Sequence, residues 1–349
     1  MTEILLTIFF ISVLLIFLGS GIWVAISMVG VSSIGMMLFT TRPVGDAMAT
    51  TIWGASSSWT LTALPLFVWM GEILFRTKLS ENLFEGLSPW MQKLPGGLVH
   101  VNVVGCALFA AISGSSAATV ATVGKMSIPE LRKRKYPESI LLGSLAGSGT
   151  LGLLIPPSII LIIYGVTVQE SIAKLFIAGI VPGIMIALIF MTYVMIWSLI
   201  NKKSMPTFKQ DFSLMEKVRK SGKLIPVILL IVSVIGSIYT GIATATEAAS
   251  LGVVGALILS YFQKSLSLRT FKESLLGATK TSCMIAFILA GATFLSLAMG
   301  FTGLPRNLAL WIEGMELSPY VLIFVLMIFY IILGMFLDGI SAVVLTMAI

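Results

Sequence analysis

The chain has 349 residues, of which 57% are hydrophobic and only 11% are charged, and its mean hydropathy is +1.04. Soluble domains carry about 25% charged residues, so this composition excludes a water-soluble globule. The remaining solvent is lipid, in which a membrane-spanning helix needs about 20 mostly apolar residues. The net charge of +7 is typical of basic cytoplasmic loops and does not indicate a nucleic-acid partner.

Apolar segments follow one another along the chain and predict an all-α polytopic membrane protein. The first segment has no basic flank, and a second apolar run follows at once, so we expect a retained helix and not a signal peptide. The predicted segments are residues 4–18, 22–39, 52–75, 97–124, 139–164, 172–200, 224–239, 245–262, 282–301 and 319–349.

The lysines and arginines predict which side of the membrane each loop faces. With the N-terminus outside and residues 97–124 entering and leaving on one face, only Arg42, Lys174 and Arg306 lie outside, and the other nineteen lie inside. If residues 97–124 cross the membrane, seventeen of these charges lie outside. If the arrangement in which residues 97–124 cross is turned over as a whole, the same seventeen charges lie inside, so charge alone keeps that alternative open.

A polar interruption indicates whether residues 97–124 cross the membrane or turn back within it. Ser113, Gly114, Ser115 and Ser116 stand in the middle of this apolar run. A helix that stops at membrane depth exposes backbone groups, which lipid tolerates only where protein or a polar cavity shelters them. We therefore predict a re-entrant helical hairpin with these four residues at its tip.

The second half of the chain repeats the order of the first: a span, an amphipathic segment and an interrupted apolar segment. Such inverted repeats place binding sites near the bilayer midplane, between discontinuous elements. Because residue 349 ends an apolar run, the second repeat is predicted to be incomplete and the C-terminus truncated. The predicted parts are a first repeat at 1–200 with hairpin 97–124, a basic cytoplasmic linker at 201–223, and a second repeat at 224–349 with hairpin 319–349.

The tip of the first hairpin carries groups that bind ions. The hydroxyls of Ser113, Ser115 and Ser116, with carbonyls freed by a turn at Gly114, present oxygen to a hard cation. Helix N-termini near such breaks attract anions. We therefore predict all four residues as sodium ligands, and Ser115 and Ser116 also as substrate contacts.

A second interruption lies inside the next span, where the sequence reads GLLIPPS at residues 152–158. Pro156 and Pro157 remove two donors and disfavour helix just before them, so the carbonyls between Gly152 and Ile155 are expected to be free. We predict Gly152, Ile155 and Pro156 as part of the sodium site and Ser158 as a substrate contact.

The third interruption falls at residues 334–341, within the last apolar segment. Gly334 and Ser341 are predicted sodium candidates. Asp338 is a carboxylate inside a hydrophobic hairpin, where an acidic residue costs about 2.5–3.5 kcal/mol on insertion scales and therefore usually faces a cavity. We predict that Asp338 contacts substrate, and a cap on backbone amides is the alternative interpretation.

Other polar residues have structural explanations. Glu247 follows Thr244 by three residues, the pattern of a helix-capping box. Glu72, near the end of its span, predicts a contact at an interface between parts of the protein. No metalloprotease, phosphate-loop or dinucleotide motif is present, so we expect neither an enzyme, nor a cofactor, nor an ATP-driven pump.

Several motifs resemble the large membrane subunit of the tripartite ATP-independent periplasmic (TRAP) transporters, and the resemblance covers essentially the whole chain. The motifs are ALPLF at 63–67, GE at 71–72, LPGGLVHVNVV at 94–104, FAAISGSS at 109–116, LIPPS at 154–158, YG at 164–165 and TATEAA at 244–249.

The resemblance implies a protein of the bacterial or archaeal inner membrane that works with a small four-helix membrane subunit. It implies a periplasmic binding protein that delivers a carboxylate, such as a C4-dicarboxylate or a sugar acid. It further implies sodium-driven import by an elevator-type movement of a transport region against a scaffold region, with sodium sites at both hairpin tips. The second Pro-Pro break of the family would follow residue 349, so the second ion site is expected to be incomplete.

Two other functions stay open. A standalone ion-coupled carboxylate carrier with a similar twin-hairpin core would need no binding protein. A truncated remnant or scaffold subunit would not transport at all.

Overall fold

The computed structural model describes residues 3–77, 79–206, 212–335 and 339–347, and every regular element within these ranges is a helix. Among the described residues, four helices are long and apolar enough to cross a membrane, and a fifth is added if an interrupted pair counts as one span. The all-α polytopic fold is therefore confirmed. The four are α10 (Ile172–Ile200), the continuous helix Leu214–Tyr239, α13 (Ala245–Phe262) and α14 (Leu268–Thr302).

The chain forms two compact units, one built from both ends of the chain and the other from its continuous middle part. One unit consists of Met1–Leu61 and Ser282–Ile349, and the other is Thr62–Thr281. The chain passes between the units twice, after Leu61 and after Thr281. Each unit draws on both predicted repeats, and the division into repeats stays a prediction.

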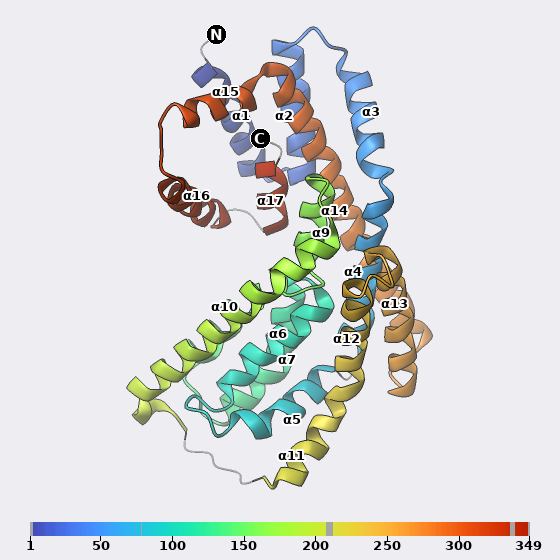
Figure 1. Ribbon diagram of the computed structural model, residues 1–349, viewed down its shortest axis with the longest axis vertical. Coiled ribbons are helices and arrows are strands. Elements are labelled where there is room, and N and C mark those ends of the chain that lie inside the picture. The colour runs from blue at the N-terminus through green and yellow to red at the C-terminus, as the bar shows by residue number, and fades with distance from the viewer. Residues whose placement is uncertain (1–2, 78, 207–211, 336–338, 348–349) are drawn as a thin grey trace. The chain divides into compact units, whose positions relative to one another are not determined.

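In the first unit, a small core holds α14 against the N-terminal helices. Met36, Phe294 and Ala298 are buried together. A Cβ atom added to Gly291 would lie 2.8 Å from the Ala25 carbonyl oxygen, so the two backbones approach closely. The helices of this unit, besides the second part of α14, are α1 (Glu3–Gly19), α2 (Val24–Phe39), α3 (Val44–Ser56), α15 (Leu304–Glu313), α16 (Pro319–Gly334) and α17 (Gly339–Met347) (Figure 1).

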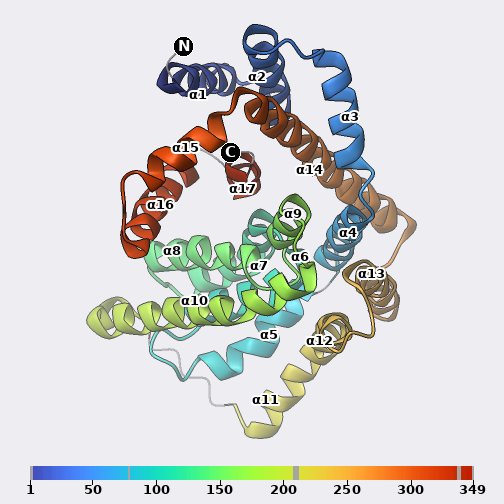
Figure 2. The ribbon, with the colours of Figure 1, turned by 45° about the horizontal axis from the view of Figure 1, so that its top comes forward.

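In the second unit, α6 is the central helix, and it packs against α5, α7, α8 and α10 (Figure 2). A close contact also joins α4 to α13, because Gly252 on α13 leaves room for the sulfur of Met70 on α4. Besides α10, α13 and the start of α14, the helices are α4 (Ala63–Phe75), α5 (Leu79–Met91), α6 (Val99–Ser113), α7 (Ser116–Lys133), α8 (Glu138–Gly149), α9 (Ile159–Thr167), α11 (Leu214–Ser221) and α12 (Ile225–Tyr239).

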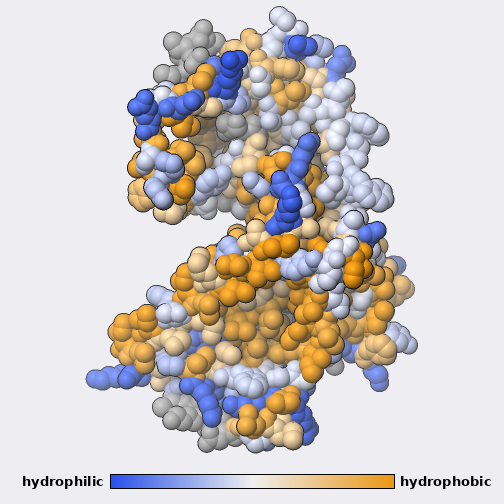
Figure 3. All heavy atoms as spheres, in the orientation of Figure 1, coloured by the Kyte–Doolittle hydropathy of each residue, from blue (hydrophilic) through white to orange (hydrophobic). Residues whose placement is uncertain are grey.

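Much of the surface is apolar, as a lipid-facing protein requires. Val181 on α10 is 73% exposed and Val232 on α12 is 60% exposed. Figure 3 shows hydrophobic residues gathered over these two helices. A helix that is apolar on its exposed face is stable in a hydrocarbon environment and not in water.

Several predicted boundaries differ from the structure. The predicted span 52–75 begins too late, because α3 starts directly after Pro43 and meets no further proline before Ser56. The predicted span 52–75 is interrupted between Ser56 and Trp59. The predicted segment 282–301 also begins too late, since α14 lacks a proline and runs without a break from Leu268 to Thr302.

The second limb of the first hairpin is longer than predicted. Helix α7 continues beyond residue 124 to Lys133. Val123, Ser127 and Leu131 are buried on one face at a spacing of four residues, so the helix keeps an inward face after the apolar run has ended. The prediction followed total hydropathy and therefore stopped too early.

The predicted capping box at the start of α13 is confirmed. The Thr244 amide donates to Glu247 Oε2 at 2.8 Å, and the Glu247 amide donates to Thr244 Oγ1 at 3.3 Å. We expect Thr244→Ala to lower the thermal unfolding midpoint in detergent by a few degrees, because the Glu247 amide loses its acceptor. Ser250→Ala on the same helix is the control, and equal midpoints for both variants would contradict this role.

Candidate functional site

The tip of the first hairpin is a two-residue turn between α6 and α7, which pack against each other. Gly114 ends α6 in the left-handed conformation, with φ of +57°. Ser115 caps α7, because its Oγ accepts a hydrogen bond from the Ala118 amide at 3.4 Å. The structure thus places the turn at the predicted residues, and the re-entrant course through a membrane stays a prediction.

A buried hydroxyl cluster stands behind the turn. The Ser113 and Thr119 hydroxyls are 2.9 Å apart. Thr119 Oγ1 donates to the Ser115 carbonyl oxygen at 2.7 Å, and Ser113 Oγ lies 3.3 Å from the same oxygen. Ser116 Oγ is buried and has no hydrogen-bond partner among the described residues. Oxygen atoms of hydroxyl and carbonyl groups therefore concentrate at the tip.

The predicted break follows α8 as a short 3-10 turn, η2 (Thr150–Leu153), and α9 begins at Ile159. Not all the carbonyls expected to be free are free. Leu153 O accepts from Ser158 Oγ at 2.6 Å. Ser158 is fully buried and also caps α9, so its hydroxyl already has local partners.

The hairpin tip and the break lie against each other. A Cβ atom on Gly114 would lie 2.9 Å from the Ile159 amide nitrogen and 3.0 Å from the Pro157 carbonyl oxygen. A Cβ atom on Gly152 would lie 3.1 Å from the Ser116 amide nitrogen. Both glycines are therefore required by close backbone contact, and the structure brings the two predicted motifs into one junction.

Helix α10 also packs closely against the break. A Cβ atom on Gly179 would lie 2.6 Å from the Leu154 carbonyl oxygen, and one on Gly183 would lie 2.8 Å from the Ile155 side chain. Sequence reasoning missed both residues. The available signal was their spacing of four, which is the small-xxx-small pattern of closely packed membrane helices.

The junction can attract ions of either sign. Two helices, α7 and α9, begin there with Ser115 and Ser158 as caps, so their amide ends favour an anion. Helix α6 and η2 end there, so their carbonyl ends favour a cation. The described part of the chain contains no group of three His, Cys, Asp or Glu residues that could hold a metal. Oxygen at this junction comes from hydroxyls and carbonyls.

Sequence reasoning also missed a row of hydroxyls on α7 and its neighbour. Thr119 is fully buried, and the hydroxyls of Thr122 and Ser148 are buried without a hydrogen-bond partner in the described residues. The spacing of four from Ser115 to Thr119 and of three to Thr122 places these residues on one helix face. That periodicity was the signal that could have found them.

The predicted second tip belongs to the other compact unit. Gly334 ends α16 and is exposed, whereas Ser341 is buried in α17. Asp338 lies outside the described residues. The roles predicted for these three residues stay predictions.

Two further polar residues have local partners. Glu72 on α4 pairs with Arg76 at 3.1 Å, within the unit Thr62–Thr281. His100 is buried on α6, and its Nε2 lies 2.7 Å from the Pro95 carbonyl oxygen, so the ring contacts the segment that leads into the hairpin. Discontinuous helices that meet inside an all-α membrane protein are typical of secondary transporters. The fold and the junction therefore define a membrane transport protein.

Residues 10–349 match the family described as Tripartite ATP-independent periplasmic transporter, DctM component. The chain belongs to this family, so the resemblance predicted from its motifs is confirmed. It is a multi-pass transport protein of the bacterial inner membrane and not an enzyme.

The relatives that this chain resembles are named for different substrates. The chain is 33% identical to the C4-dicarboxylate TRAP transporter large permease protein DctM of Pseudomonas aeruginosa, over 90% of this chain and 72% of that protein. It is 30% identical to the isethionate TRAP transporter permease protein DctMQ of Oleidesulfovibrio alaskensis, over 94% of this chain and 52% of that protein. It is 32% identical to the 2,3-diketo-L-gulonate TRAP transporter large permease protein YiaN of Escherichia coli, over 83% of this chain and 68% of that protein.

Proposed function

We propose that this chain is the large subunit of a sodium-coupled secondary transporter that imports small organic anions. The substrates are C4-dicarboxylates or sugar acids. A periplasmic binding protein delivers them, and a small four-helix membrane subunit completes the complex. The observation that carries the proposal is the junction between the hairpin tip and the break after η2.

The junction supports the proposal because it joins the two kinds of site that coupled transport needs. The hydroxyl cluster and the carbonyl ends of α6 and η2 offer oxygen to sodium, while the amide ends of α7 and α9 favour an anion. Sodium entry supplies the drive, since one charge crossing 100 mV releases about 2.3 kcal/mol. The sodium candidates are Ser113, Gly114, Ser115, Ser116, Gly152, Ile155 and Pro156, with Gly334 and Ser341 at the second tip.

The substrate class is supported by the names of the relatives, which include a C4-dicarboxylate and a keto sugar acid. Ser115, Ser116, Ser158 and Asp338 stay substrate candidates. The Ser158 hydroxyl bonds to the Leu153 carbonyl oxygen. We therefore assign the contact with substrate to the backbone amides at the start of α9, the helix that Ser158 caps. An elevator-type movement of a transport region against a scaffold region would carry the substrate across the membrane.

Reconstitution tests this function. The chain is placed in liposomes with its small membrane subunit, and a radiolabelled carboxylate panel is supplied with and without the cognate binding protein. We expect uptake of one carboxylate only with the binding protein present. Sodium-driven uptake without it would indicate a standalone carrier, and no uptake under any condition would indicate a subunit that does not transport.

A further inference from the structure

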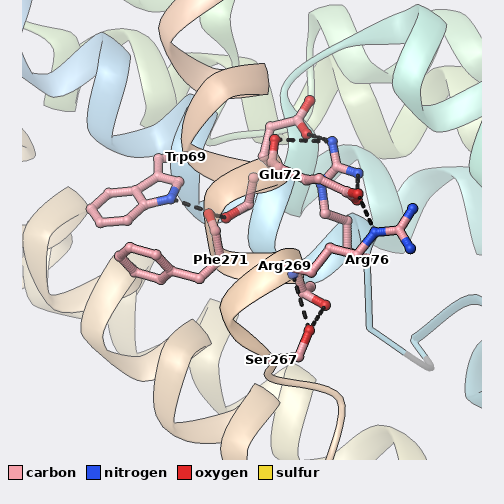
Figure 4. Close-up of polar contacts among 9 residues, drawn as sticks. Trp69, Glu72, Arg76, Ser267, Arg269 and Phe271 are labelled. Carbon is pink, nitrogen blue, oxygen red and sulfur yellow. Dashed lines mark hydrogen bonds and ion pairs between the residues drawn. The ribbon is translucent and has the colours of Figure 1, made fainter.

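The two helices through which the chain enters and leaves the unit Thr62–Thr281 are fastened to each other. These helices are α4 and the first part of α14, and Arg76 links them (Figure 4). Its Nη2 lies 3.1 Å from Glu72 Oε2 and donates to the Glu273 carbonyl oxygen at 3.2 Å. Its Nη1 lies 3.4 Å from Glu273 Oε2. One guanidinium thus holds two carboxylates on two helices.

Further contacts reinforce this link. Glu273 Oε1 accepts from Arg269 Nε at 2.8 Å. Trp69 Nε1 donates to Ser274 Oγ at 3.3 Å, and its ring meets the Phe271 ring edge to face, with the centroids 5.8 Å apart. Figure 4 shows the aromatic pair and the charged groups side by side between the two helices. Polar and apolar contacts therefore join the same pair of helices.

The link is partly buried. The side chains of Arg76 and Glu72 are each 25% exposed, and that of Glu273, which forms the ion pair between the two helices, is 44% exposed. A Cβ atom on Gly277 would lie 2.6 Å from Glu72 Oε2, so α14 presents bare backbone to this carboxylate. Exposed ion pairs contribute little, whereas breaking a part-buried network leaves a charge without its partner. We call Glu72, Arg76 and Glu273 the arginine clamp.

We propose that the arginine clamp joins α4 and the first part of α14 into one rigid connector during transport. The chain joins the two units only after Leu61 and after Thr281. Because the clamp fastens both connections inside one unit, any movement between the units is carried by both connections together. Arg76 is then a positioning residue, and this inference rests on the proposed transport function.

The first test removes the guanidinium. In the reconstituted complex, Arg76→Met is expected to lower the maximal uptake rate about tenfold and to leave the half-saturating sodium concentration unchanged, since the substitution removes no oxygen atom of the hairpin junction. The charge exchange Arg76→Glu with Glu273→Arg is expected to recover part of the rate. Arg132→Met is the matched control, because Arg132 and Glu138 form an exposed ion pair in the same unit. An unchanged rate in Arg76→Met would overturn the proposal.

The second test asks whether the helices separate. Thiols are introduced by Trp69→Cys and Phe271→Cys, with the exposed native thiol removed by Cys283→Ser, and are joined by a short bis-maleimide. We expect the cross-linked protein to transport at the rate of the same variant without linker. Loss of uptake on cross-linking would mean that the helices must separate, which contradicts a rigid connector.

A third readout does not depend on transport. Adding Arg76→Met to the thiol variant is expected to lower the cross-linking yield in liposomes several-fold, because α4 and α14 are less firmly held. Equal yields with similar unfolding midpoints would overturn the proposal even if no uptake is found. Failure of the unmodified complex to transport would instead contradict the proposed function, so the two failures are distinguishable.

Discussion

Gly114→Ala is expected to reduce uptake by about a hundredfold, to the background of empty liposomes. Gly114 has φ of +57°, which costs a residue with a side chain about 1–2 kcal/mol. The added Cβ atom would also lie 2.9 Å from the Ile159 amide nitrogen, and a backbone atom cannot move aside as a side chain can. The tip must then withdraw from the break, and the junction opens. Initial uptake rates at equal protein content measure this effect.

Gly143→Ala is the matched control for this substitution. Gly143 lies on α8, and nothing stands within 4 Å of the position its Cβ atom would take. We expect uptake close to that of the unchanged protein. If Gly114→Ala elutes as a folded protein and transports at a similar rate, the close contact between tip and break is not needed for transport.

Thr119→Val is expected to raise the half-saturating sodium concentration about tenfold. Valine keeps the shape of threonine but removes the hydroxyl that bonds to the Ser115 carbonyl oxygen at 2.7 Å and to Ser113 Oγ at 2.9 Å. Leaving buried polar groups unsatisfied costs about 1–3 kcal/mol, and tenfold corresponds to about 1.4 kcal/mol. The measurement is uptake rate against sodium concentration at saturating substrate.

Two variants control for other effects of this change. Thr119→Ser keeps the hydroxyl and should restore a sodium dependence close to that of the unchanged protein. Thr192→Val removes an exposed hydroxyl that, among the described residues, bonds to Leu188 of its own helix, so it should change neither rate nor sodium dependence. A sodium dependence unaltered by Thr119→Val would separate the hydroxyl cluster from ion binding.

Local signals predicted much of the fold and the position of the junction. Apolar runs longer than a membrane span predict helices whatever they pack against, and Gly114 and Pro156 interrupt such runs through their own backbone chemistry. These features need no knowledge of distant contacts. The predicted tip and break therefore coincide with real interruptions of the helices.

The remaining features depend on contacts between distant segments. Arg76 and Glu273 are 197 residues apart, and nothing near either residue predicts their pairing. The free carbonyl expected at Leu153 is occupied because Ser158 turns back across the prolines. Likewise, the two compact units could not be predicted, since one of them joins the two ends of the chain around a continuous middle part.

Sodium coupling is tested most directly by a single comparison in proteoliposomes. The complete complex with substrate-loaded binding protein is given an inward sodium gradient, and the same preparation is then given an equal gradient of potassium at the same pH. We expect carboxylate accumulation only with the sodium gradient. Equal accumulation with either cation would contradict sodium coupling at the junction of hairpin tip and helix break.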